Sequence, residues 1–166
     1  MKKQFLPVPS LNIYTDDSKI DDKTGSAFCV AEEDTEKYEW MVQLRPLNTV
    51  FQAQILVIHE TCLWANKITQ QVKVWSGSKS SIHSIASVDT KGHIAQQTQE
   101  ILLKYTNIKL GWIRAHVGYC GNETANVLAK KATHSGSPHT TQGQESISRV
   151  CYKKSPSSTG KKIRTM

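Results

Sequence analysis

The 166-residue chain is predicted to fold as one α/β domain, a mixed five-stranded sheet flanked by helices. Three β-prone segments follow one another near the N-terminus, and this succession predicts an antiparallel meander. Helical and β-prone segments then alternate, which predicts parallel strands joined by crossover helices. With 38% hydrophobic and 21% charged residues, the chain has enough apolar side chains for one core and no room for a second full domain.

The three strands of the meander are predicted at residues 11–15, 25–30 and 36–44. The last of these alternates Tyr38, Trp40, Val42 and Leu44 with more polar neighbours, as a half-buried strand does. Asp21 and Asp22 lie between the first two segments, and aspartate is a common turn residue. We therefore expect a hairpin turn there.

The first helix is predicted to begin after Thr49, which can cap it while Gln52 reaches back in a capping box. Apolar residues follow at helical spacing to about residue 67: Phe51, Ile55, Ile58 and Cys62. The remaining elements are predicted as a strand at 72–75, helices at 78–88 and 94–105, a strand at 108–113 and a last helix at 122–133.

The domain is expected to occupy residues 11–134, between a ten-residue N-terminal extension and a basic tail at 135–166. Six basic residues and Glu145 give this tail a charge of +5, which leaves +2 of the net +7 for the rest of the chain. The tail is rich in Ser, Thr and Gly and has no apolar periodicity, so we expect it to be disordered. It could attract phosphates or have no specific role.

The four cysteines form no CxxC pair, which favours reduced, buried thiols over a disulfide framework or a metal site: Cys29, Cys62, Cys120 and Cys151. Pro7 and Pro9 interrupt the N-terminal segment, and no apolar run approaches 20 residues. We therefore expect a cytoplasmic or nuclear protein without signal peptide or transmembrane segment.

Four motifs in order resemble those of a known family. They are IYTDDSK at 13–19, TVFQAQI at 49–55, WSGSKSS at 75–81, and WIRAHVG at 112–118 followed by GNETANVLA at 121–129. In these segments the chain is similar to the type 1 ribonuclease H domain of non-LTR retrotransposons. The resemblance covers roughly residues 11–133 and implies the ribonuclease H-like fold.

The resemblance also implies a catalytic site. Members of this family hold two Mg²⁺ ions between four carboxylates and hydrolyse the RNA strand of an RNA-DNA hybrid. By motif position, Asp16 retains the first acid and His116 the auxiliary histidine. Gln54, Gly77 and Asn126 stand where the family has Glu, Asp and Asp. Neutral amides are poorer Mg²⁺ ligands than carboxylates, so we expect neither ion to be held stably.

No other acid is expected to compensate for these losses. Asp17 follows Asp16 in a strand, and adjacent strand residues point to opposite faces. Glu60 lies six positions beyond Gln54, about 240° away around the helix. Glu123 is present in the family motif as well, and is explained by the positive N-terminal end of the last helix.

We therefore expect a monomeric, nucleic-acid-binding domain of retrotransposon origin, catalytically impaired or inactive, with RNA-DNA hybrid as its partner. Candidate contacts with the nucleic acid are Ser18, Lys19, Ser78 and Asn122. Two alternatives remain: an active hybrid ribonuclease working with fewer ligands, or a non-catalytic module that binds nucleic acid or protein.

Overall fold

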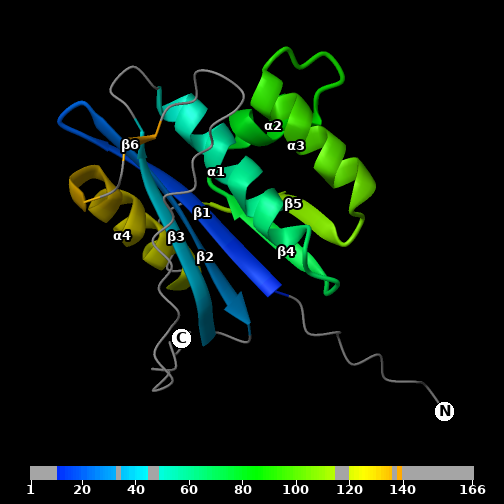
Figure 1. The fold of residues 1–166 in the computed structure, drawn as a ribbon, viewed down its shortest axis with the longest axis horizontal. Coiled ribbons are helices and arrows are strands. Elements are labelled where there is room, and N and C mark those ends of the chain that lie inside the picture. Colours follow the sequence, from blue (N-terminus) through cyan, green and yellow to red (C-terminus); the bar gives the residue numbers. More distant parts are fainter. Residues whose placement is uncertain (1–10, 33–34, 45–48, 115–119, 136–137, 140–166) are drawn as a thin grey trace.

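The structure, a computed structural model, describes residues 11–32, 35–44, 49–114, 120–135 and 138–139. Its six strands lie in the order β5-β4-β1-β2-β3-β6. Helix α4 covers one face of the sheet, and helices α1, α2 and α3 lie on the other (Figure 1). The strands are β1 (Leu11–Ile20), β2 (Lys23–Glu32), β3 (Thr35–Leu44), β4 (Val72–Ser76), β5 (Ile108–Trp112) and β6 (Pro138–His139). The helices are α1 (Val50–Ala65), α2 (Lys79–Ala86), α3 (His93–Lys104) and α4 (Cys120–Ser135).

The predicted meander is confirmed, and its first two strands are longer than expected. β1 and β2 pair antiparallel from Leu11 opposite Glu32 to Ile20 opposite Lys23. Asp21 and Asp22 join them with φ angles of 48° and 65°, the left-handed conformation that a two-residue hairpin turn requires. Aspartate tolerates this conformation better than most residues do, because its short polar side chain can bond locally.

The parallel half of the sheet also agrees with the prediction. β4 pairs in parallel with β1 on one side and with β5 on the other. The two-residue β6, which pairs with the end of β3, was not predicted, and it lies within the segment expected to be a disordered tail. Two residues have no periodicity that a sequence pattern could reveal.

The capping box of α1 is confirmed in both directions. Thr49 Oγ1 accepts a hydrogen bond from the backbone N–H of Gln52 (3.1 Å), and Gln52 Oε1 accepts one from the backbone N–H of Thr49 (2.8 Å). Every residue from Ile55 to Cys62 is buried, because α1 lies between the sheet and α3. The start of α1 is therefore fixed by local bonds and its middle by packing.

The two faces of the sheet bury different side chains. The α1 side holds the larger core, with fully buried Ile13, Phe28, Leu56 and Val74 among its members. The smaller core on the α4 side contains four alanines beside Cys29, Met41 and Leu128. Here α4 approaches β2 so closely that a Cβ on Gly25 would lie 2.2 Å from the Ala129 carbonyl oxygen. This face permits little variation in side-chain size.

Of the described cysteines, Cys29 and Cys62 are buried and Cys120 is half-buried. Burial raises the pKa of Cys62 to about 12 and that of Cys29 further, so both stay protonated at neutral pH. Cys151 lies outside the described residues. Within the described part of the chain, no helix is both long and apolar enough to cross a membrane.

Candidate functional site

A small cavity opens where β4 ends beside β1, and we call it the strand-end cavity. Thr15 is the last residue of β1 that pairs with β4, and its partner is Ser76. Beyond this pair β1 continues to Ile20, with no further strand partner on that side among the described residues. The cavity has a volume of about 190 Å³ and is lined by Thr15, Asp16, Asp17, Gln54, Val57, Ser76, Gly77 and Ser78. Carboxyl ends of parallel strands are a common place for ligand sites.

Asp16 lines this cavity and is hydrogen-bonded to helix α4. Asn126 Nδ2 donates a hydrogen bond to Asp16 Oδ2 (2.9 Å), and the backbone N–H of Asp17 donates one to Asp16 Oδ1 (2.8 Å). Residue 126 therefore serves as a donor to Asp16, whereas a carboxylate at this position would be a second acceptor. The motif comparison placed these two positions together, and the structure does so as well.

The expectation that Asp17 could not reach this site was wrong. Asp17 does face the α1 side and Asp16 the α4 side, as strand alternation requires, yet both line the strand-end cavity. The reason is that β4 ends at Ser76. Past that point, within the described part of the chain, β1 has an unpaired edge, and side chains from both faces of the sheet can border the space beside it. Had β1 been predicted at its full length, the comparison with the shorter β4 would have indicated this unpaired edge.

The environment of Asp17 favours its protonated form. Burial raises the pKa of this carboxyl to about 7, a hydrogen bond from the Gln54 side chain opposes the rise, and the nearby Asp16 adds to it. Asp17 is therefore a second carboxyl group in the cavity, and its negative charge is only partly present at neutral pH.

Gln54 connects this carboxyl group to α2. Its Oε1 accepts a hydrogen bond from Ser81 Oγ (3.0 Å), which leaves its amide N–H groups for Asp17. The Ser81 hydroxyl also lies 2.9 Å from the hydroxyl of Ser78, which caps α2 and accepts from the Ser81 backbone N–H. The substituted position 54 is thus part of a chain of hydrogen bonds from α2 through α1 to β1.

The residues present do not fit a pair of Mg²⁺ ions. Gly77, which lines the cavity, offers no side-chain ligand, and the amide nitrogen atoms of Gln54 and Asn126 are oriented as donors towards the two carboxyl groups. Both oxygens of Asp16 already accept protein hydrogen bonds. Two adjacent dications need compensating negative charge, which this donor set lacks. Nor do the described residues contain three or more His, Cys, Asp or Glu side chains grouped as metal ligands.

The other predicted site residues differ in whether they lie near the cavity and in how exposed they are. Ser78 lines the cavity, and Ser18 and Lys19 follow along β1, with Lys19 exposed. Asn122 is buried, with 4% of its surface exposed, which leaves little of it for contact with a nucleic acid. His116 lies outside the described residues, and Glu60 is buried on α1 away from the cavity lining.

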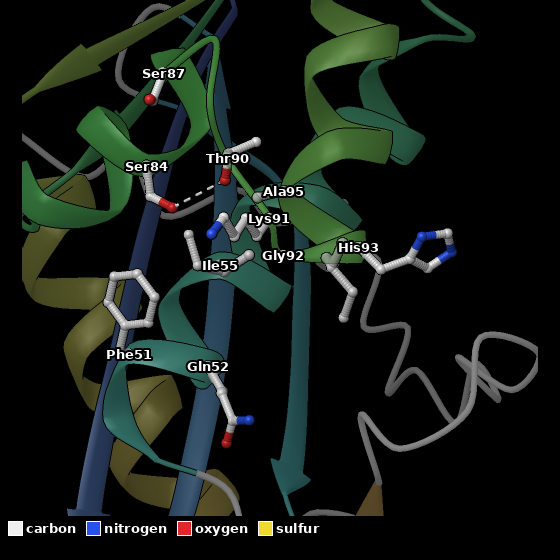
Figure 2. A pocket seen from close by; sticks show the side chains of 11 residues that line it. Phe51, Gln52, Ile55, Ser84, Ser87, Thr90, Lys91, Gly92, His93 and Ala95 are labelled. Atoms are coloured by element: carbon white, nitrogen blue, oxygen red, sulfur yellow. Dashed lines mark hydrogen bonds between the residues drawn. The ribbon is translucent and has the colours of Figure 1, made fainter.

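A larger cavity of about 480 Å³ lies between the first turns of α1 and the segment that joins α2 to α3 (Figure 2). Its walls include Phe51 and Ile55 from α1, and Ser84 and Thr90, whose hydroxyls lie 3.4 Å apart. It shares no lining residue with the strand-end cavity. The sequence motifs did not indicate this cavity, because its residues come from two separate stretches, 51–55 and 84–95, without a common pattern.

Comparisons with known proteins agree with this architecture. The sequence profile of the family described as RNase H matches residues 9–134. Among solved structures, the native prototype foamy virus protease-reverse transcriptase is similar at 21% identity and a TM-score of 0.65, over 75% of this chain and 21% of that one. The PFV RNase H domain in solution is similar at 19% identity and a TM-score of 0.61, over 75% and 93% of the two chains.

A third similar structure is the foamy viral protease-reverse transcriptase in complex with RNA/DNA hybrid, at 16% identity and a TM-score of 0.57, covering 81% of this chain and 21% of that chain. The present chain thus spans about a fifth of the viral protease-reverse transcriptases that it resembles. No curated protein matches it. At these identities the structural likeness establishes the shared fold.

Proposed function

Because the chain belongs to the RNase H family, we propose that it is an RNA-DNA hybrid-binding domain of retrotransposon origin whose hydrolytic activity is lost or strongly impaired. The family is one of metal-dependent nucleic-acid hydrolases. The structural relative bound to RNA/DNA hybrid supports the choice of partner. The four motifs shared with non-LTR retrotransposon domains support the origin.

The observation that carries this proposal is the bond between Asn126 and Asp16. Where the family needs two carboxylates to share a metal ion, this chain has an amide donating directly to the remaining carboxylate (2.9 Å). The same exchange of acceptor for donor occurs at Gln54, towards Asp17. In each pair the amide donates a hydrogen bond to the carboxyl group, so a cation would have to displace that bond before it could bind.

Hydrolysis with a reduced set of ligands is the second candidate, and Asp17 favours it. This carboxyl lines the same cavity as Asp16, and it stands where the family motif has glycine. If Asp17 substitutes for a lost ligand, catalysis must depend on it as strongly as on Asp16. A purely interacting module, the third alternative, would retain binding and show no cleavage under any condition.

Cleavage of a labelled RNA-DNA hybrid, measured in Mg²⁺ and in Mn²⁺, tests the proposal. We expect no cleavage by the unaltered chain and recovery of cleavage by the variant that carries Gln54→Glu, Gly77→Asp and Asn126→Asp together. Asp16→Asn added to that variant is the matched control and should abolish the recovered activity.

Clear cleavage by the unaltered chain that is lost in Asp16→Asn would overturn the proposal. The variant Asp17→Asn then decides the second candidate, because loss of that cleavage would show that Asp17 has replaced a family ligand. If the triple variant also fails to cleave while it still binds hybrid, the non-catalytic module is favoured.

A further inference from the structure

A row of paired residues runs across the sheet from the strand-end cavity to an exposed tryptophan. Thr15 on β1 pairs with Ser76 on β4, and Ser76 pairs with Trp112 on β5. The first two of these residues line the cavity, and Trp112 continues the same row to the edge strand. Neighbouring strands lie about 4.8 Å apart, so the Cα of Trp112 lies about 10 Å from that of Thr15.

Trp112 differs from the other three tryptophans in its exposure. Trp40 is buried, Trp64 stacks on Tyr38 in the larger core, and Trp75 donates its indole N–H to Asn12 Oδ1 (3.0 Å). By contrast, 43% of the Trp112 surface is exposed. An exposed indole at the rim of a site has a flat face on which a nucleobase can stack.

A lysine accompanies this indole. Lys79 Nζ lies 4.1 Å from the centre of the Trp112 ring, within the range of a cation-π contact. Lys79 is the first residue of α2 and directly follows Ser78, which lines the cavity. Arg114, two residues after Trp112, is exposed as well. The rim therefore combines an aromatic surface with positive charge, whereas the cavity itself contains carboxyl groups.

We propose that Trp112 and Lys79 form a contact site for a nucleic-acid strand that passes the strand-end cavity. A nucleobase stacks on the indole, and the Lys79 ammonium moves from the ring to a neighbouring phosphate. The site rests on the proposed function, since it assumes that nucleic acid is the partner. It adds a contact region to which none of the five retained or substituted family positions belongs.

Binding of fluorescein-labelled RNA-DNA hybrid and of the corresponding single-stranded RNA, followed by anisotropy in EDTA, tests this site on the full chain. We expect Trp112→Leu to weaken binding about tenfold, because stacking is lost, and Trp112→Phe to recover most of it. Lys79→Gln should weaken binding several-fold and lower the slope of log affinity against log salt by about one. Leu103→Ala, at an exposed apolar position on α3, is the matched control and should bind like the unaltered chain.

Each outcome decides a different point. If Trp112→Leu binds as tightly as Leu103→Ala, the contact site is refuted while hybrid binding by the domain stands. If the unaltered chain binds neither probe, both the contact site and the nucleic-acid part of the proposed function are refuted. Quenching of tryptophan fluorescence by unlabelled RNA should decrease in Trp112→Phe, which a merely destabilised fold would not explain.

Discussion

The two faces of the sheet hold the strand-end cavity in different ways. On the α4 side, the backbone of β2 at Gly25 lies against the carbonyl of Ala129, and one direct hydrogen bond joins Asn126 to Asp16. On the α1 side, large aliphatic and aromatic side chains pack, and a chain of bonds from Ser81 through Gln54 reaches Asp17. The first face is fixed by close approach of backbones, and the second by interlocking side chains, so substitutions should affect them unequally.

The largest expected effect is on the α4 side, from Gly25→Ala. The added methyl group would lie 2.2 Å from a backbone oxygen, and no side-chain rotation can relieve that contact. We expect a loss of at least about 3 kcal/mol in the free energy of unfolding, or no folded protein. Urea denaturation followed by circular dichroism measures it. The reference on the α1 side is Ile58→Val, for which we expect about 1 kcal/mol; equal losses in the two variants would contradict the comparison.

Asn126→Asp should have the next largest effect, and it should depend on magnesium. Without metal, the variant places an acceptor against an acceptor, and we expect a loss of about 2 kcal/mol. Millimolar Mg²⁺ should restore part of it, because the added carboxylate improves the ligand set. Thermal melts in EDTA and in MgCl₂ at matched ionic strength provide the measurement.

Asn126→Ala is the control for that prediction. It removes the donor without adding charge, so it should lose stability and show no recovery in Mg²⁺. An unaltered chain that is itself strongly stabilised by Mg²⁺ would argue that its own site binds the ion.

On the α1 side, His59 should make stability depend on pH. His59 Nδ1 donates to the Thr98 hydroxyl oxygen, whose own proton is donated to the Ile94 carbonyl. Both the neutral and the protonated ring can make this bond, so burial decides between the two forms. Burial, with a smaller contribution from His93, lowers the pKa of His59 from 6.5 to about 4. This contribution to stability is present above pH 6.5 and is lost as the pH falls towards 4, by up to about 3 kcal/mol.

Urea denaturation of the unaltered chain and of His59→Asn between pH 4 and 7.5 measures this dependence. The variant lacks the titrating ring, so its stability should decline less steeply with acid, whatever its stability at pH 7.5. Parallel curves for the two proteins would show that other groups cause the acid sensitivity.

The smallest effect is expected at the beginning of α1. Gln52→Ala removes the reverse half of the capping box and leaves the backbone N–H of Thr49 to water, which should cost about 0.5 kcal/mol. Thr49→Ala removes the N-cap hydroxyl that accepts from the backbone N–H of Gln52 and should cost about 1 kcal/mol. The same denaturation experiment compares them, and a reversed order would contradict the assignment of the cap.

Much of the fold could be predicted from the sequence because local signals agreed with one another. The capping box at Thr49, the aspartates of the first turn and the alternation through Trp40 each specify a conformation over a few residues. The short β6 and the extension of β1 to Ile20 carry no such signal. Both depend on which strand lies alongside, and that is a property of the assembled sheet.

The candidate site was predictable only where a motif fixed a position. Asp16, Gln54, Gly77 and Asn126 meet as the resemblance implied. The position of Asp17 in the strand-end cavity was missed, because strand alternation predicts which face of a sheet a side chain is on and says nothing of an unpaired strand edge. The pairing of Lys79 with Trp112 was also missed, since the two residues are far apart in sequence and meet only when α2 lies beside β5.

The turn at Asp21 and Asp22 decides which residues lie opposite one another in β1 and β2, and so which helix each aspartate faces. Its two left-handed residues lock Ile20 opposite Lys23 and so determine every pair back to Leu11. A slip of one residue would rotate β1 by half a turn and exchange its faces, which would present Asp17 to α4 and Asp16 to α1. A two-residue chain reversal therefore decides which aspartate meets which amide.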